Sequence, residues 1–192
     1  MEVCRAWLAH MRVRWYLLAG RRQAALALLD QALGRCPHDT RALATRAHVM
    51  AELGDGAGAL QAQAQLVALR PADAAGWFNH GYLCEAAGRL EEAEQAFRRA
   101  VAIDPRLDRA WYGLGLSLIA QRRLDEALVA LRKNTELQPM SPYGWYQLAR
   151  VHVDRQEPAE AEMIIRHLQR FEPRIAAQLH RETGLGGQPA HA

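Results

Sequence analysis

The chain has 192 residues, 50% of them hydrophobic and 23% charged, a composition typical of folded proteins that excludes an intrinsically disordered chain. The net charge is only +3, and the cationic residues are arginine except for Lys133, a skew that says little about ligands. Cys4, Cys36 and Cys84 lack CxxC spacing, which excludes a disulfide framework and a cysteine zinc site. The apolar stretch 15–19 is too short for a signal-peptide core, and the sequence predicts a cytoplasmic protein without membrane insertion.

An internal repeat of 34 residues runs along the chain. Trp77, Trp111 and Trp145 are each separated by that period. Prolines, alanines and small residues keep the same register: Pro37, Pro71, Pro105, Pro139 and Pro173; Ala25, Ala59, Ala93, Ala127 and Ala161; Val13, Ala47, Gly81, Gly115 and Ala149. We therefore divide the chain into repeats 6–39, 40–73, 74–107, 108–141 and 142–175.

Each repeat is predicted to contain two helices. In the third repeat Trp77, Gly81 and Cys84 share one helical face, and a second amphipathic run follows at 90–103. Gly88 lies between them and suits a left-handed helix end, as do Gly20 and Gly54 in the first two repeats.

The boundaries between repeats also carry helix-start signals. Asp39, Asp73 and Ser141 each follow a repeat proline by two residues, where their side chains are expected to cap the next helix. Pro142 suits the first turn of a helix. After Pro173 we expect a capping helix at about 174–183 and a flexible tail at 184–192, so that residues 1–183 form a single domain.

This pattern resembles the tetratricopeptide repeat (TPR) family over about nine-tenths of the chain. The residues that carry the resemblance are clearest in the third repeat: Trp77, Gly81, Ala93, Phe97, Ala100 and Pro105. Ala9 and Leu43 depart from the pattern at the tryptophan position, and Gln63 departs at a position that is usually apolar. The resemblance implies an all-α, right-handed superhelical solenoid of helix-turn-helix repeats with a C-terminal capping helix.

The resemblance also implies a non-catalytic scaffold, adaptor or co-chaperone that holds a protein or an extended peptide in a concave groove. Carried over by position, the groove residues are Arg41, Ala44, Thr45, His48, Glu52, Phe78, Asn79, Tyr82, Glu85, Arg109, Tyr112, Leu116, Tyr143, Tyr146, Gln147, Arg150 and Asp154. Phe78, Tyr112 and Tyr146 would form a ladder of one aromatic per repeat, unless these rings only cover a neighbouring helix.

The groove lacks the lysine and asparagine set with which some family members bind chaperone tails. Asn79 alone fits that set, and aromatic side chains stand where lysine is needed. We therefore expect a partner peptide with apolar anchors and some acidic character.

Parts of the sequence bear on three other functions. His80 and Cys84 share a helix face but fall at inward-packing positions, and no metal or nucleotide motif is present, so neither an enzyme nor a cofactor is expected. The arginines near the turns, among them Arg22 and Arg123, form a candidate nucleic-acid edge, although acidic residues lie beside them. A homodimer through an N-terminal face is the third alternative, with Trp7, Met11 and Leu18 as its contacts.

Overall fold

The computed structural model describes the backbone of residues 2–185 and the side chains of residues 10–185. The described backbone is helical, without a β-strand, and the chain divides into two compact units, residues 1–103 and 104–192. The first unit contains α1 (Glu2–Leu18), α2 (Arg22–Arg35), α3 (Thr40–Glu52), α4 (Gly56–Leu69), α5 (Ala74–Ala86) and α6 (Leu90–Ile103). The second contains α7 (Asp108–Ala120), α8 (Leu124–Leu137), α9 (Pro142–Asp154), α10 (Pro158–Gln169) and α11 (Pro173–Thr183).

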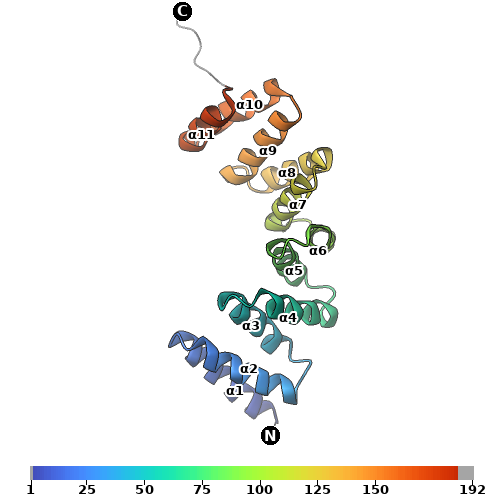
Figure 1. The fold of residues 1–192 in the computed structure, drawn as a ribbon, viewed down its shortest axis with the longest axis vertical. Coiled ribbons are helices and arrows are strands. Elements are labelled where there is room, and N and C mark those ends of the chain that lie inside the picture. Colours follow the sequence, from blue (N-terminus) through green and yellow to red (C-terminus); the bar gives the residue numbers. More distant parts are fainter. Residues whose placement is uncertain (1, 186–192) are drawn as a thin grey trace, which may run out of the picture. The chain divides into compact units, whose positions relative to one another are not determined.

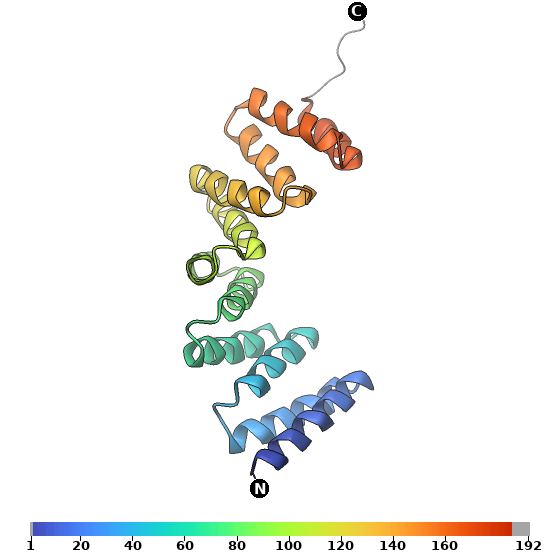
Figure 2. The same cartoon turned by 180° about the vertical axis from the view of Figure 1, so that it is seen from behind.

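Within each unit, every helix packs against the next one in the chain, so the helices form successive hairpins (Figures 1 and 2). Each of the pairs α1/α2, α3/α4, α5/α6, α7/α8 and α9/α10 falls within one 34-residue repeat. The all-α, helix-turn-helix fold class predicted from the sequence is confirmed.

The small residue at the eighth position of a repeat allows the two helices of a hairpin to touch. A Cβ atom added to Gly81 would lie 2.8 Å from the ring of Phe97, which is itself fully buried on α6. A Cβ atom added to Gly115 would lie 2.7 Å from Leu131 on α8. These distances are below van der Waals contact, so a larger residue at either position would force the buried Phe97 or Leu131 side chain to move.

The helix starts follow the sequence prediction in part. The carboxylate of Asp39 accepts hydrogen bonds from two backbone N–H groups of α3, and that of Asp73 accepts one from Gly76 at 3.1 Å. Ser141 makes no side-chain capping bond, contrary to the prediction, although Pro142 does open α9. Asp55 caps α4 through the N–H of Gly58 at 2.9 Å, which sequence reasoning missed.

The turn inside each repeat has one left-handed residue. Gly20, Gly54 and Gly88 have φ of 71°, 82° and 74°, as the sequence predicted. At the same register position in the last two repeats, Arg122 and Gln156 have φ of 61° and 62°. The left-handed conformation is thus kept in repeats that have no glycine at this position, and there the Cβ atom adds a steric cost.

The repeat tryptophans are anchored by the repeat prolines. The indole N–H of Trp77 donates to the carbonyl oxygen of Pro71 at 3.0 Å. Trp111 and Trp145 donate in the same way to the prolines six residues before them, each at 2.9 Å. These hydrogen bonds link each tryptophan to the turn before its repeat, and the three rings are half-buried, so they also contribute to the core.

The second unit ends with α11, which packs against both α10 and α9. Ala176 and Leu179 are fully buried on its inner side. Among the described residues, no helix combines the length and apolar character that a membrane-spanning segment needs.

Candidate functional site

The exposed face of α3 and α5 carries the predicted groove residues of the first unit. Arg41 and His48 are exposed on α3, and Asn79 and Tyr82 are exposed on α5, with 60% of Tyr82 open to solvent. We call these four residues, together with Phe78, the α3/α5 surface. It offers an aromatic ring, an amide and a guanidinium group, all of which suit binding to a polypeptide.

Phe78 is less open than the ladder expectation implies. Its ring lies half-buried against the ring of Phe97, with centroids 5.9 Å apart and an interplanar angle of 44°. Phe78 therefore serves the core of its own repeat and presents only part of its ring to solvent. Tyr82, one helical turn later, is the more accessible aromatic of α5.

Acidic residues on the same helices are partly engaged. Glu52 accepts a 2.6 Å hydrogen bond from Nε of Arg22, and that bond lowers the pKa of its carboxyl group. Burial raises the pKa of Glu85. Of these two carboxylates, Glu52 is already satisfied by the protein itself.

The predicted groove residues of the second unit differ in accessibility. Tyr143 is 67% exposed and Arg109 and Arg150 are exposed. Tyr112, Leu116, Tyr146 and Gln147 are half-buried. The ladder is thus divided between the units, with Phe78 in the first and the two tyrosines in the second.

The helix α11 contacts the groove positions of the last repeat. The hydroxyl of Tyr146 donates to Oε2 of Glu182 at 2.7 Å, and Nη1 of Arg150 lies 3.3 Å from the same oxygen. A hydrogen bond from Gln178, together with those from Tyr146 and Arg150, lowers the pKa of the Glu182 carboxyl group. The sequence predicted this helix only as a cap. The contact of Glu182 with Tyr146 and Arg150 could not be predicted, because it depends on how α11 docks.

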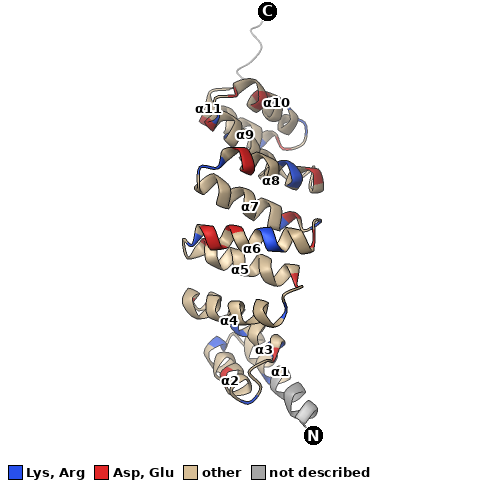
Figure 3. Ribbon diagram, turned by 90° about the vertical axis from the view of Figure 1, so that its right-hand side faces the viewer, with Lys and Arg blue, Asp and Glu red and all other residues tan. Residues whose placement is uncertain are grey.

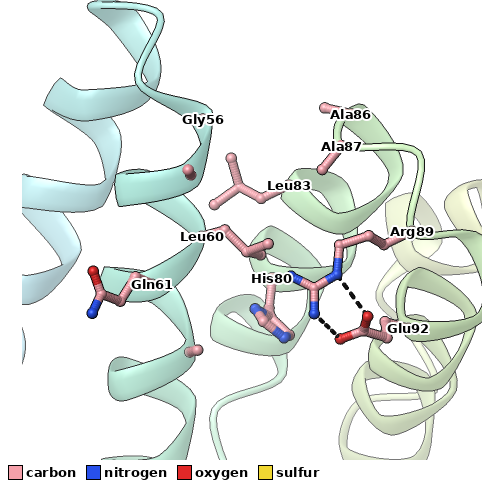
Figure 4. Close-up of a pocket in the computed structure, with 11 residues that line it drawn as sticks. Gly56, Leu60, Gln61, His80, Leu83, Ala86, Ala87, Arg89 and Glu92 are labelled. Atoms are coloured by element: carbon pink, nitrogen blue, oxygen red, sulfur yellow. Dashed lines mark hydrogen bonds and ion pairs between the residues drawn. The ribbon is translucent and has the colours of Figure 1, made fainter.

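A pocket between α4, α5 and α6 was not foreseen from the sequence. It has a volume of about 580 Å³ and is lined by Gly56, Ala57, Leu60, Gln61, Ala64, His80, Leu83, Ala86, Ala87, Arg89 and Glu92. We call it the junction pocket, because it lies between the second and third repeats. In Figure 4, Leu60 of α4 and Leu83 of α5 point toward one another across it, and the Arg89–Glu92 ion pair lies at one side.

The register of the repeats explains the junction pocket. Between the first two repeats, Arg22 of α2 pairs with Glu52 of α3 at 2.6 Å, and Asp30 pairs with Arg46 at 2.7 Å. At the next junction, 34 residues further along the chain, the positions equivalent to Arg22 and Glu52 are Gly56 and Ala86. The positions equivalent to Asp30 and Arg46 are Ala64 and His80.

Ion pairs between side chains also cross the junction between the fourth and fifth repeats. Arg155 pairs with Asp125, and Arg122 lies 3.9 Å from Asp154. The positions that correspond to Arg155 and Asp125 in the junction pocket are Ala87 and Ala57. Small side chains stand where the other junctions have ion-paired ones, and this leaves the open, largely apolar space of the junction pocket. A comparison of the repeats position by position would have revealed the pocket.

The comparisons with known proteins agree with this architecture. The family model of the cilia and flagella-associated protein 70 middle TPR-like domain matches residues 40–172, more than half of the chain. The chain belongs to this TPR-like family.

Solved TPR-like structures superpose on most of the chain. A double mutant of MamA RS-1 has a TM-score of 0.80 and 21% identity, covering 92% of this chain and 95% of that one. YrrB, described as a TPR protein with an unusual peptide-binding site, has a TM-score of 0.78 and 17% identity, covering 88% of each chain. PilW, described as a widely conserved type IV pilus biogenesis factor, has a TM-score of 0.73 and 20% identity, covering 94% of this chain and 87% of that one. At such identities these likenesses show the fold. No curated protein matches the sequence.

TPR proteins are generally non-catalytic, and the one Cys–His pair in the described residues has the wrong environment for a nucleophile. Sγ of Cys84 lies 3.8 Å from Nε2 of His80, but burial raises the pKa of the thiol and lowers that of the imidazole. Both shifts disfavour the thiolate–imidazolium pair that a reactive cysteine needs. No group of three potential metal ligands occurs among the described side chains.

The turn arginines of this TPR chain are tied to carboxylates. Arg89 pairs with Glu92 at 2.6 Å, and Arg123 pairs with Glu126 at 2.8 Å. Figure 3 shows both signs of charge along α6 and α8, whereas α4 carries no charged side chain. Mixed charge of this kind favours a solvated edge over a phosphate-binding stripe.

The N-terminal face shows the exposure that the sequence predicted. Met11 is 45% and Leu18 79% exposed on α1, and Trp15, which was not predicted to take part, is 58% exposed. The side chain of Trp7 lies outside the described residues.

Proposed function

We propose that this TPR protein is an adaptor that holds a partner polypeptide on the α3/α5 surface. The observation that carries the proposal is Tyr82, a large aromatic side chain that is 60% exposed beside the exposed amide of Asn79. A tyrosine of this kind buries a large area on binding and loses little rotamer entropy, which is why it is enriched at binding hot spots.

The chemistry of the surface indicates the kind of partner. Arg41 and His48 are exposed on α3 of the same unit, so they are the groups available to an acidic residue next to an apolar anchor, although Nε2 of His48 also lies 3.5 Å from Glu52. Asn79 can donate to and accept from a peptide backbone. These features support an extended segment with apolar anchors and acidic character, rather than a chaperone tail, whose lysine and asparagine set is missing here.

The fold comparison supports a peptide ligand by analogy only. YrrB, which has the same fold, is described as having an unusual peptide-binding site. The pairing of Arg89 and Arg123 with carboxylates further supports a polypeptide over a nucleic acid.

Affinity capture from a native lysate tests the proposal. The double variant Asn79→Ala/Tyr82→Ala should lose a partner that the wild type retains, because each exposed contact of this kind is worth about 1 kcal/mol or more at a hot spot. Arg99→Ala is the matched control, since Arg99 is exposed on α6 of the same unit. Loss of the same partner from the control, or retention by the double variant, would contradict the proposal.

A further inference from the structure

The junction pocket has largely apolar walls, and none of the side chains described in its unit fills it. Leu60 and Leu83 face one another across it, alanines make up most of the remaining lining, and the polar groups are Gln61, His80 and the Arg89–Glu92 ion pair. The volume of about 580 Å³ lies in the range of about 300–1,000 Å³ typical of ligand pockets. The helix α4, which forms one wall, carries no charged residue. The pocket is therefore suited to a large apolar side chain.

The same unit exposes such a side chain. Trp15, Met11 and Leu18 are spaced by four and three residues and form one stripe on α1. By the 34-residue register Trp15 corresponds to Val49, which is fully buried, and to Leu83, which lines the junction pocket. Trp15 thus occupies a position that other repeats bury, yet 58% of it is exposed.

The charges beside the stripe and the pocket are complementary. Arg12 and Arg14 are exposed on either side of the stripe. Asp55 and Glu91 are exposed and are the sequence neighbours of the pocket residues Gly56 and Glu92, while Arg89, the cation of the pocket lining, is paired with Glu92. Opposite charges around an apolar contact steer and align two surfaces.

We infer that the junction pocket receives Trp15 from a second copy of the chain. Stripe and pocket belong to the same unit, so a two-fold dimer would form the contact twice, with each copy giving one Trp15 and receiving one. The pocket residues are different from those of the α3/α5 surface, so this inference does not rest on the proposed function.

Light scattering coupled to size exclusion, run on the full chain over micromolar to millimolar concentrations, tests this inference. The wild type should show a concentration-dependent dimer, and Trp15→Ala should weaken it about tenfold or more. The double variant Gly56→Arg/Ala86→Glu should weaken it equally, because it fills the pocket with the pair that Arg22 and Glu52 make at the preceding junction. Tyr143→Ala, which removes from the second unit an aromatic side chain that is 67% exposed, should leave the dimer unchanged.

Mixing the two variants makes the test specific. Trp15→Ala keeps the pocket but lacks the tryptophan, whereas Gly56→Arg/Ala86→Glu keeps the tryptophan but lacks the pocket. An equimolar mixture should form a mixed dimer through one intact contact, although neither variant dimerises well alone. A contact between two Trp15 side chains would give no such complementation. A wild type that stays monomeric, a pocket-filled variant that dimerises normally, or a mixture without complementation would overturn the inference; thermal melting confirms that each variant is folded.

Discussion

The hydroxyl of Tyr146 on α9 donates a 2.7 Å hydrogen bond to the carboxylate of Glu182 on α11. The contact joins a predicted groove residue to the last described helix of the same chain. Arg150 adds to it, since its guanidinium lies 3.2 Å from the Tyr146 hydroxyl and 3.3 Å from the same carboxylate oxygen. The chain therefore satisfies two of its own groove residues at this end.

Removing that hydroxyl should loosen α11. In Tyr146→Phe the ring stays but the bond to Glu182 is lost, so backbone amides in residues 173–183 should exchange severalfold faster, with no change in the first unit. Hydrogen exchange followed by mass spectrometry measures this. Tyr143→Phe is the control, because Tyr143 is 67% exposed; an equal effect of both variants would rule out the specific contact.

The turn conformation predicts opposite effects of two glycine changes. Gln156→Gly should raise the free energy of unfolding by about 0.5–1 kcal/mol, because a left-handed residue with a Cβ atom costs about 1–2 kcal/mol and the extra backbone entropy that glycine loses on folding offsets about half of that gain. Gly88→Ala should lower the free energy of unfolding by about 1 kcal/mol at the equivalent turn. Urea denaturation curves of the two variants report both effects, and destabilisation by Gln156→Gly would show that the turn is not strained.

The pH dependence of stability should contain a contribution from Glu157. Hydrogen bonds from Arg155 and from His152 lower the pKa of its carboxyl group from 4.5 to about 2. A carboxyl group with a lowered pKa in the folded state stabilises the fold above its unfolded pKa, and this contribution is lost as the pH falls from about 4.5 to about 2. The melting temperature of Glu157→Gln should therefore lie below that of the wild type at pH 6, and the difference should shrink toward pH 2. A difference that is constant with pH would exclude titration of Glu157 as its cause.

The two described cysteines should react at very different rates. Cys36 is exposed, whereas Cys84 is fully buried and burial raises the pKa of its thiol. In the native protein a thiol reagent should modify Cys36 quickly, and Cys84 only after unfolding. Peptide mapping by mass spectrometry assigns the modified sites, and rapid labelling of native Cys84 would reopen the case for a reactive nucleophile.

The period of the sequence predicted the helix pairs because it is set by packing that every repeat shares. Gly81 leaves no room for a Cβ atom beside Phe97, and the same register position has a small residue or valine in every repeat, so this spacing is visible in the sequence. The same holds for Trp77 and Pro71, whose hydrogen bond links two positions of the repeat pattern.

The site was harder to predict because its contacts are not repeated. The burial of Phe78 against Phe97 depends on ring orientation, and the bond from Tyr146 to Glu182 depends on the docking of α11. The junction pocket arises from small residues, Gly56 and Ala86 among them, at positions where other repeats have ion-paired side chains. A search for conserved pattern residues passes over such substitutions.

Photo-crosslinking from position 82 tests the central claim most directly. A photoreactive phenylalanine analogue would replace Tyr82 on α5 in one protein and Arg99 on α6 of the same unit in another, both exposed positions. If a partner binds the α3/α5 surface, position 82 should crosslink one defined polypeptide in the native cell and position 99 should not. Equal crosslinking from both positions, or crosslinking from position 99 alone, would contradict the account.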